Sequence, residues 1–322
     1  MRSRAGAPRE MRSPTGPSEL GAGLFSRTTL PERMSRVVAV GRFDGVHRGH
    51  QLLFREARLV AQSLPLTAYT FPPRGPSLLT LDAKERLLGK HADEVLTVPW
   101  ERIQNLSPEE FLRHELVDRL AATGVVVGPD HRFGRGRLGD PSLLRRLSGP
   151  LGLSVHVIEP LRLEADVVSA ARIRALVASG DVVTAATLLG RPAWLAGMPT
   201  PGMKLARRLG YPTVNLDLAP ELVRPRPGVY AAWAQWPGGE DKALFYIGDR
   251  PTFPQAPPSA EVHLFTPPAG AVGGPVEVHL ALFLRPDERF ADERALVHQI
   301  ARDRARGEET LDGLATPARL LG

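Results

Sequence analysis

The sequence predicts two domains: an α/β domain built on a doubly wound parallel sheet, then a small antiparallel β-barrel or β-sandwich that ends in a helix. In the first part of the chain, short continuous apolar runs alternate with helical patterns, which indicates buried parallel strands joined by right-handed crossovers. After Gly190, short strand patterns are separated by turns rich in Pro and Gly, without long helices, which is typical of an antiparallel barrel or sandwich. The chain has 322 residues, and at roughly 150 residues per domain this length also suggests two.

The α/β domain is expected over 37–187. The apolar run Val37–Val40 predicts its first strand, a glycine-containing turn follows over 41–49, and a helical pattern covers 50–62. The same patterns predict further strands at 66–71, 94–98, 125–128 and 154–159, and helices at 82–90, 107–122, 141–147, 170–178 and 181–189.

The second domain is expected over 188–316, because the strand and turn texture continues to a final helical pattern near 291–306. Its strands are predicted at 211–218, 228–236, 243–247, 260–265 and 275–284.

The composition excludes several classes of function. The chain has no cysteine, so disulfides, thiolate metal sites and a Cys nucleophile are ruled out. Hydrophobic residues make up 43% and charged residues 24%, which is ordinary for a globular protein. No apolar run approaches the ~20 residues that cross a bilayer. We therefore expect a globular protein without a membrane partner, and the sequence does not indicate its oligomeric state.

The positive charge of the chain is concentrated at its N-terminus. Lys and Arg number 41 against 35 Asp and Glu, a formal charge of +6. Residues 1–36 hold seven of the Arg and three of the Glu, which leaves 34 basic against 32 acidic residues for the remainder. A nucleic-acid surface would need a clustered excess of positive charge, so we expect no nucleic-acid partner. Residues 1–36 lack hydrophobic periodicity and are rich in Pro, Ser, Gly and Arg, so we expect a disordered leader.

The turn between the first strand and the first helix reads G-R-F-D-G-V-H-R-G-H. Open α/β sheets bind ligands at such a junction, and the helix start offers unpaired N–H groups and a positive dipole end to phosphate. Gly41, Gly45 and Gly49 allow close approach to the backbone. His47 and His50, three residues apart, share a face and can donate to phosphate oxygens. A plain glycine-rich turn is the alternative, and a metal site is a weaker one because a third ligand is not apparent.

This string resembles the H-x-G-H signature of the Rossmann-like nucleotidyltransferase superfamily. In its fuller form it is similar to the bacterial family of bifunctional riboflavin kinase/FAD synthetases (FMN adenylyltransferases). The resemblance implies a cytoplasmic enzyme that uses riboflavin, FMN and ATP, with Mg²⁺ accompanying the ATP. The α/β domain would adenylylate FMN to FAD with release of pyrophosphate, and a C-terminal β-barrel would phosphorylate riboflavin. It implies catalytic roles for His47 and His50 and nucleotide binding by Gly41, Phe43, Asp44, Gly45 and Gly49.

Two later stretches of the α/β domain also resemble signatures of the family. Asp130 follows the apolar run 125–127, and a carboxylate at a strand end can orient a ribose or Mg²⁺. Positions 169–174 read S-A-A-R-I-R where the family has S-S-T-x-I-R. Ser169 is a plausible N-cap, and cations in the following helical turns favour a bound anion. The resemblance implies nucleotide binding by Gly128, Asp130, Ser169, Arg172 and Arg174.

Departures from the family pattern leave alternatives open. The two hydroxyls lost at Ala170 and Ala171 would contact phosphate in the family, and the family's F-x-P-H-P element is Phe71-Pro72-Pro73-Arg74 here. The chain is therefore also compatible with a riboflavin kinase whose synthetase activity is weakened or lost. A flavin- or nucleotide-binding regulator without catalysis is a third interpretation.

The second domain carries a separate match to the kinase half of the family. A glycine-containing segment leads into G-Y-P-T-V-N, which resembles the family's G-[FY]-P-T-x-N. Thr213 and Asn215 alternate along a strand, so their side chains point the same way, and oxygen ligands together with phosphates suit Mg²⁺. The resemblance implies nucleotide binding by Gly202, Arg207 and Gly210 and Mg²⁺ binding by Thr213 and Asn215.

The string A-E-V-H-L near residue 261 resembles the family's V-E-V-H-L. In the family this glutamate takes the proton from the ribityl hydroxyl of the flavin, which implies a catalytic role for Glu261. We expect Glu261 on an inward face of the barrel, where a carboxylate without a partner or a task is costly. A second E-V-H string at 277–279 lies where the family has a plain strand, so we treat it as a decoy. The segment F-L-R-P and a following Phe resemble the family's flavin region, which implies flavin binding by Arg285 and Phe290.

Overall fold

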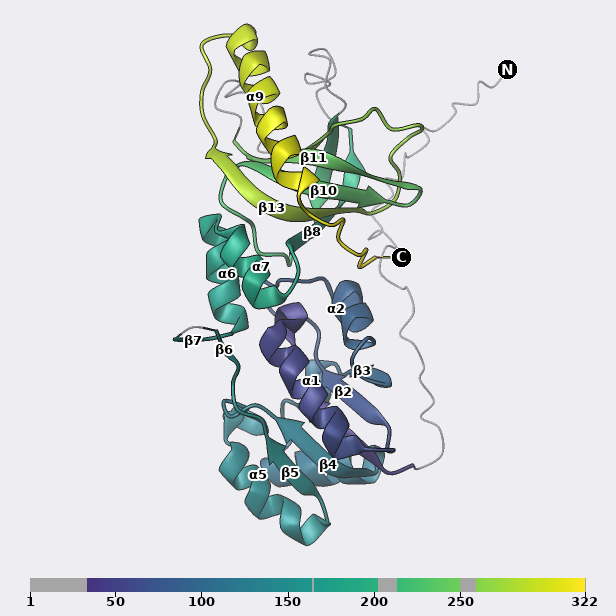
Figure 1. Cartoon of the computed structure of the whole chain (residues 1–322). Helices are drawn as coiled ribbons and strands as arrows, with labels where there is room; N and C mark the ends of the chain where they lie inside the picture. The colour runs from purple at the N-terminus through teal and green to yellow at the C-terminus, as the bar shows by residue number, and fades with distance from the viewer. Residues whose placement is uncertain (1–33, 164, 202–212, 250–258, 322) are drawn as a thin grey trace, which may run out of the picture. The chain divides into compact units, whose positions relative to one another are not determined.

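The computed structural model describes residues 34–163, 165–201, 213–249 and 259–321 (Figure 1). The predicted leader therefore lies almost entirely outside the described residues. Arg36 was predicted to end this leader, but it is buried and begins β1. The charged end of Arg36 pairs with Glu94 of β3, two strands away in the sheet, which explains why an arginine is tolerated there.

The first domain is a five-stranded parallel sheet, as predicted, and its strands follow the order β3-β2-β1-β4-β5. Its order reverses at β1, which pairs with β2 on one side and β4 on the other. Ligands bind at such a switch point, outside the carboxyl ends of the strands. The strands are β1 Arg36–Val40, β2 Leu66–Thr70, β3 Glu94–Thr97, β4 Ala122–Val127 and β5 Ser154–Val157.

Helices connect and follow these strands close to their predicted positions, except for α3, which was not predicted. They are α1 Arg48–Ala61, α2 Leu81–Leu88, α3 Trp100–Ile103, α4 Pro108–Glu110, α5 Pro141–Ser148, α6 Ala170–Ser179 and α7 Val182–Leu189. Shorter elements are the 3-10 turns Asp44–Val46, Arg135–Arg137 and Gly149–Leu151, and a small two-stranded sheet of β6 Arg162–Leu163 and β7 Asp166–Val167.

The helix predicted over 107–122 is the clearest difference in this domain. It starts as expected, with a capping box between Ser107 and Glu110, but continues as a π-helix over Phe111–Arg119. It ends early because Ala121 turns the chain with a φ of 50°, and β4 then begins three residues before its predicted start.

The second domain is a closed six-stranded barrel, which decides between the barrel and the sandwich. Around the barrel the strands follow the order β10-β11-β12-β9-β8-β13. They are β8 Ala193–Thr200, β9 Thr213–Leu218, β10 Gly228–Trp236, β11 Gly239–Gly248, β12 Ser259–Leu264 and β13 Val276–Pro286.

Strand β8 was not predicted, because Gly197 and Pro199 look like turn residues. Gly197 pairs with Leu218 of β9, and a Cβ built on it would lie 2.6 Å from the carbonyl oxygen of Asp217. The glycine therefore allows two strand backbones to approach closely and does not belong to a loop.

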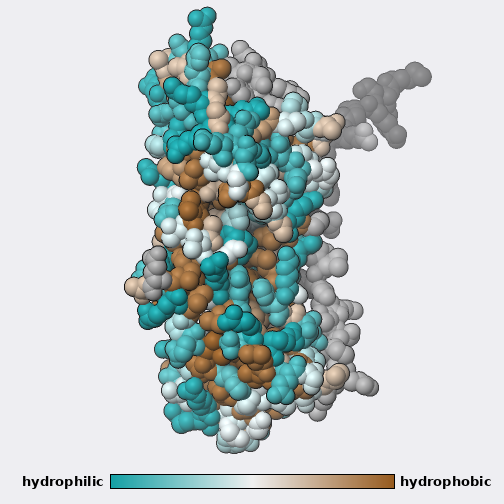
Figure 2. Space-filling model, viewed as in Figure 1, coloured by the Kyte–Doolittle hydropathy of each residue, from teal (hydrophilic) through white to brown (hydrophobic). Residues whose placement is uncertain are grey.

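Helix α9 (Glu293–Asp312) covers one outer face of the barrel and runs six residues beyond its predicted end (Figure 1). Its buried residues Ile300, Asp303, Gly307 and Leu311 form one stripe, and the surface over the helix is largely hydrophilic (Figure 2). A Cβ on Gly307 would lie 3.2 Å from both Leu244 and Phe265, so this glycine sets how closely α9 approaches the strands. In the part of the chain that the structure describes, no helix is both long and apolar enough to cross a membrane.

We predict that Gly197→Ala destabilises the barrel by about 1–3 kcal/mol, because the added methyl group meets backbone atoms of β9 that side-chain rotation cannot move. Chemical denaturation measures the effect. Gly313→Ala is the matched control, since a Cβ at Gly313 meets nothing within 4 Å. Equal stabilities for the two variants would contradict this account of β8.

Candidate active sites

The loop between β1 and α1 has an unusual backbone. Phe43 and Val46 have φ angles of 50° and 40°, and Gly45 between them has 76°. The left-handed region is uncommon for a residue with a side chain and is a genuine outlier for β-branched valine. Such strain persists where the surroundings enforce it, most often at functional sites. Here Phe43 is buried and packs against Phe54 with ring centroids 4.8 Å apart.

The two histidines of this loop lie together, as predicted. Their rings stack with centroids 3.6 Å apart. His47 is the N-cap of α1, and its Nδ1 accepts the backbone N–H of His50 at 3.3 Å. This bond assigns the proton of a neutral His47 to Nε2, which leaves that nitrogen as a donor.

Both imidazoles are neutral near pH 7. Burial lowers the pKa of His47 from 6.5 to about 4, and the charge of Arg191 lowers it further, while Asp44 and Asp130 oppose the shift. Burial also holds the pKa of His50 well below its usual value, helped by His47 and Lys84. Hydrogen-bond donation to phosphate from neutral rings is therefore the chemistry available here.

Asp44 joins the loop to two other parts of the domain. One carboxylate oxygen accepts the Ser77 hydroxyl at 2.9 Å and the Leu78 N–H at 2.8 Å. The other oxygen pairs with Arg174 of α6. The structure thus brings Arg174 to the H-x-G-H loop, as the predicted site requires, and makes Asp44 an internal connector.

The remaining predicted residues of this domain lie around the same loop. Ser169 caps α6 by accepting the N–H of Arg172 at 3.3 Å, as predicted. A Cβ on Gly49 would lie 3.4 Å from the Val168 carbonyl oxygen, so the starts of α1 and α6 are adjacent. A Cβ on Gly41 would lie 2.7 Å from the Phe43 ring.

Gly128 and Asp130 follow β4, the strand beside β1. The side chain of Arg172 pairs with Asp166 at 2.9 Å. The sequence predicted a bound anion near Arg172 and Arg174. In this structure, carboxylates of the protein supply that negative charge. No ligand need be invoked to explain why these two arginines occupy the start of α6.

Sequence reasoning missed two cations beside this loop. Lys84 of α2 is almost fully buried, and its amine donates to the carbonyls of Phe71 and Arg42, beyond the ends of β2 and β1. Burial lowers its pKa to about 8. The sequence offered one indication: Lys84 falls at the same helical spacing as the buried apolar residues of α2. Arg191 donates to the Gly45 carbonyl at 2.6 Å, and nothing in its sequence context marks it.

The candidate kinase site lies on the outer face of the barrel beside α9. Asn215 and Tyr246 are the two cross-strand neighbours of Glu261, and Thr213 is opposite His263. Residues directly opposite each other share a face of the sheet. In the sequence, Thr213 and His263 are 50 positions apart, and the barrel brings them together.

The expectation that Glu261 faces inward is wrong. Its neighbours Val262 and Leu264 belong to the apolar interior of the barrel. Phe265 and Leu244, which lie on the face of Glu261, pack instead with Ile300 and Leu311 of α9. The predicted alternation along β12 is correct, but the predicted side of the barrel is wrong. Helix α9 covers the outer face, so apolar residues occur on that face as well as in the interior.

Side chains on this face are linked by hydrogen bonds. The Ser259 hydroxyl donates to Glu261 at 2.9 Å, and the Thr213 hydroxyl lies 3.0 Å from Nδ1 of His263. Burial lowers the pKa of His263, which favours the neutral ring as the acceptor of that bond. His263 Nε2 is 3.9 Å from Glu261.

The predicted flavin residues lie at the edge of the same face. The Arg285 guanidinium is 5.3 Å from the Phe290 ring centroid and donates to Asp303 of α9 at 2.8 Å. Gln299 donates to the other oxygen of Asp303 at 2.8 Å. Helix α9 therefore holds Arg285 in place. Gly202, Arg207 and Gly210 lie outside the described residues.

The second E-V-H string has a structural task. Glu277 is fully buried and accepts Nε1 of Trp194 at 2.9 Å and the N–H groups of Leu320 and Leu321 at 2.7 and 2.9 Å. Its carboxylate fastens the C-terminal segment to the barrel.

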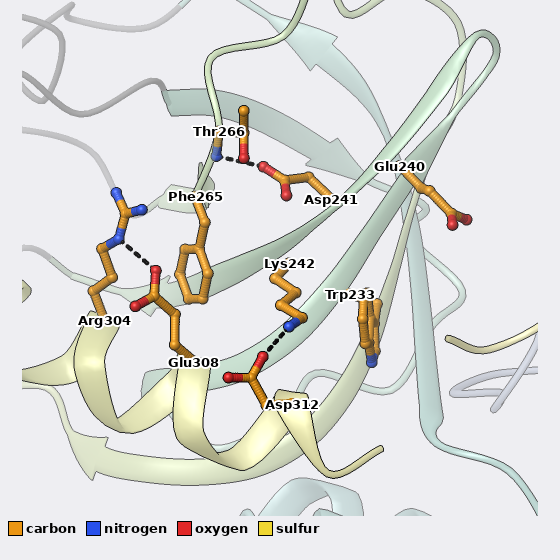
Figure 3. Close-up of a pocket in the computed structure, with 9 residues that line it drawn as sticks. All are labelled: Trp233, Glu240, Asp241, Lys242, Phe265, Thr266, Arg304, Glu308 and Asp312. Carbon is orange, nitrogen blue, oxygen red and sulfur yellow. Dashed lines mark hydrogen bonds and ion pairs between the residues drawn. The ribbon is translucent and has the colours of Figure 1, made fainter. Parts of the chain in front are cut away.

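A cavity of about 440 Å³ lies between the C-terminal half of α9 and the barrel (Figure 3). The charges around it bind one another: Lys242 pairs with Asp312, and Arg304 pairs with Glu308 at 3.0 Å. We regard this cavity as part of the α9 packing and assign no substrate to it. Among the described residues, no three His, Asp or Glu side chains converge to hold a metal ion.

Family models match both halves of the chain. A FAD synthetase model matches residues 30–172 and a Riboflavin kinase model matches residues 189–311. The bifunctional riboflavin kinase/FMN adenylyltransferase of Pseudomonas fluorescens is 34% identical over 85% of this chain and 92% of its own length. The protein of the same name from Escherichia coli K12 is 33% identical over 92% of this chain and 98% of its own.

These matches define a bifunctional transferase that joins a nucleotidyltransferase domain to a kinase barrel. The chain belongs to the bifunctional riboflavin kinase/FMN adenylyltransferase family. The resemblance drawn from the sequence motifs is thereby confirmed.

One solved structure shares the fold over most of the chain. It comes from Streptococcus pneumoniae, is described as a macrolide-efflux protein, and gives a TM-score of 0.77 at 27% identity, over 85% of this chain and 94% of its own. Its description names a transport role, which concerns that protein and is not carried to this chain.

The buried histidine gives a testable pH dependence. Because the pKa of His47 falls from 6.5 to about 4 on folding, the unfolded chain binds a proton more readily, and stability is lost as the pH falls below 6.5. Near pH 5 this loss amounts to about 2 kcal/mol relative to neutral pH.

Urea denaturation of the wild type and His47→Gln at several pH values measures this effect, since the other histidines are common to both. We expect the advantage of the wild type at pH 7.5 to shrink on acidification. An advantage that stays constant down to pH 5 would show that His47 is not buried as described.

Proposed function

We propose that the barrel transfers the γ-phosphoryl group of ATP to riboflavin, giving FMN, and that the α/β domain transfers AMP from a second ATP to FMN, giving FAD and pyrophosphate. The observation that carries this proposal is the match of both halves to the corresponding family models over one chain. A kinase without the synthetase, or a regulator without catalysis, is not favoured, because the relatives over the full length carry both activities in their names.

For adenylyl transfer, we assign the α-phosphate to the start of α1. The neutral imidazoles of His47 and His50 donate to its oxygens as negative charge develops during attack by FMN. The N–H groups at the helix start and the cations Lys84 and Arg191 favour the polyphosphate. No covalent intermediate is needed, since the phosphate of FMN is itself the nucleophile. Ala170 and Ala171 leave the backbone N–H groups of α6 to replace the missing hydroxyls.

For phosphoryl transfer, Glu261 accepts the proton of the ribityl hydroxyl as it attacks the γ-phosphorus. Asn215 beside it and Thr213 next along the strand would hold Mg²⁺ with the nucleotide phosphates. These two residues fit Mg²⁺, because both side chains offer an oxygen ligand. The Thr213 hydroxyl can direct its hydrogen to Nδ1 of His263, which leaves its oxygen for the metal. When bound, the metal neutralises phosphate charge. Phosphoryl transfer needs mainly such positioning. Arg285 and Phe290 would contact the flavin.

The substrates follow from the family, whereas other aspects stay predictions. These predictions are a cytoplasmic location, the lack of nucleic-acid and membrane partners, and a domain boundary near residue 188. The boundary is supported by the gap between the two matched segments.

We predict that Glu261→Gln lowers the rate of FMN formation by at least about 100-fold, because the hydroxyl loses its proton acceptor. FAD formation from supplied FMN should be unchanged. Chromatography of flavins formed from riboflavin or FMN with Mg-ATP measures both rates.

Glu277→Gln is the matched control, since it makes the same change in the other E-V-H string. It should lower the unfolding temperature and leave the rate of FMN formation intact below that temperature. Simultaneous loss of both reactions in Glu261→Gln would show that Glu261 is structural.

We predict the converse result for His50→Gln. FAD formation should fall by about 10²–10³-fold, because one stabilising donor to the α-phosphate is lost, while FMN formation from riboflavin continues. The same chromatographic assay gives both rates. Undiminished FAD formation would place the adenylyl-transfer site elsewhere.

A further inference from the structure

The carbonyl groups just before His47 are held by Arg191, which follows α7, and by Gln51 of α1, which also contacts the last residue of α7. The Gly45 carbonyl accepts an N–H of Arg191 at 2.6 Å. The Val46 carbonyl accepts the side-chain amide of Gln51 at 2.9 Å, and the same amide donates to the Leu189 carbonyl at 3.0 Å. Both peptide groups of the strained turn are therefore tied to 189–191.

This attachment matters because the turn cannot hold its own shape. Three of the four residues 43–46 have positive φ angles, a combination that relaxes unless its surroundings enforce it. Within the turn itself, the Val46 N–H donates to the Phe43 carbonyl at 3.1 Å, which fixes its start. The peptide groups nearest His47 depend on Arg191 and Gln51.

A charged Arg191 is energetically costly if its only role is to bind the Gly45 carbonyl. It is partly buried, its buried Nε has no hydrogen-bond partner in the described structure, and burial lowers its pKa to about 10, so it stays charged. A buried cation is costly without compensation. A neutral donor would bind a carbonyl at lower cost, so the retained charge points to a nearby anion during function. The phosphates assigned to the start of α1 are such an anion.

We propose that Arg191 is a positioning residue for adenylyl transfer, which clamps the Gly45 carbonyl and so fixes the turn that presents His47 to the nucleotide. Arg191 lies within the segment matched by the Riboflavin kinase model, yet acts on the other reaction. The proposal rests on the function proposed above.

The test compares Arg191→Ala with the wild type in both reactions of the full-length chain. Loss of a charge-assisted hydrogen bond should lower kcat for FAD formation from FMN by about 10- to 100-fold. The KM for FMN should change less, because the clamp acts on the catalytic loop. FMN formation from riboflavin should stay within about twofold and shows that the variant is folded.

Added methylguanidinium should restore part of the lost FAD rate, by entering the space that the side chain vacates. A purely structural defect would not respond to it. Arg224→Ala is the matched control, since Arg224 also donates a guanidinium N–H to a backbone carbonyl, that of Leu218 at 3.0 Å. It should leave both rates unchanged and show no response to methylguanidinium.

A second readout is the pKa of His47, followed by NMR and assigned with His47→Gln. The charged groups that act on it are Asp44, Arg191 and Asp130, and its ring stacks on that of His50. Loss of the Arg191 charge should raise it, and Arg191→Lys should keep it near the wild-type value while FAD formation still falls about tenfold, since the shorter amine loses the fork geometry.

The outcomes separate the two claims. A wild type that makes no FAD refutes the proposed function. A wild type that makes FAD, together with an Arg191→Ala variant of undiminished kcat, refutes the role of Arg191. If Arg191→Ala loses both reactions through unfolding, Arg191→Lys decides: a wild-type kcat for FAD formation in that variant also overturns the proposal.

Discussion

The left-handed turn at residues 43–46 is the constraint on which the α/β domain depends. A phenylalanine and a valine are held in a backbone region that favours glycine, and the surrounding contacts converge on keeping them there. Asp44 is fastened by Ser77, Leu78 and Arg174. The Gly45 carbonyl is held by Arg191 after α7 and the Val46 carbonyl by Gln51 of α1. The outcome is a rigid start to α1, with two neutral imidazoles stacked at the point where β1 and β4 diverge. These contacts hold the strained turn and the two imidazoles of the candidate site in one conformation.

The barrel solves its own positioning problem with a helix. The interior of this barrel is filled by apolar side chains such as Val262 and Leu264, and the polar groups of the candidate site lie on its outer face. Helix α9 lies over that outer face, packing Ile300 and Leu311 against it and fixing Arg285 through Asp303. Gly307 brings the helix close enough to do so. The result is a polar site with an apolar border, in which Glu261 is partly shielded while its carboxylate keeps the hydrogen bond from Ser259.

Local sequence was a good guide wherever local physics decides the structure. The apolar runs located the parallel strands, the H-x-G-H turn was placed at a strand–helix junction, and Ser169 was correctly read as a helix cap. Sequence failed where long-range contacts decide. Gly197 looks like a turn residue until β9 is seen beside it, and the face of Glu261 cannot be known without α9. Lys84 and Arg191 were missed because each acts on backbone carbonyls far along the chain, and such acceptors leave no pattern in the sequence.

The closure of the barrel has a consequence for how the protein is made. The first strand of the barrel, β8, pairs with the last, β13, and Glu277 on β13 then binds the N–H groups of Leu320 and Leu321. During synthesis on the ribosome, the parallel sheet has all five of its strands once residue 157 has emerged. The barrel has to wait for more than a hundred further residues. The adenylyl-transfer half can therefore collapse early around local crossovers, whereas the kinase half is exposed as an open, unpaired sheet edge until β13 has emerged.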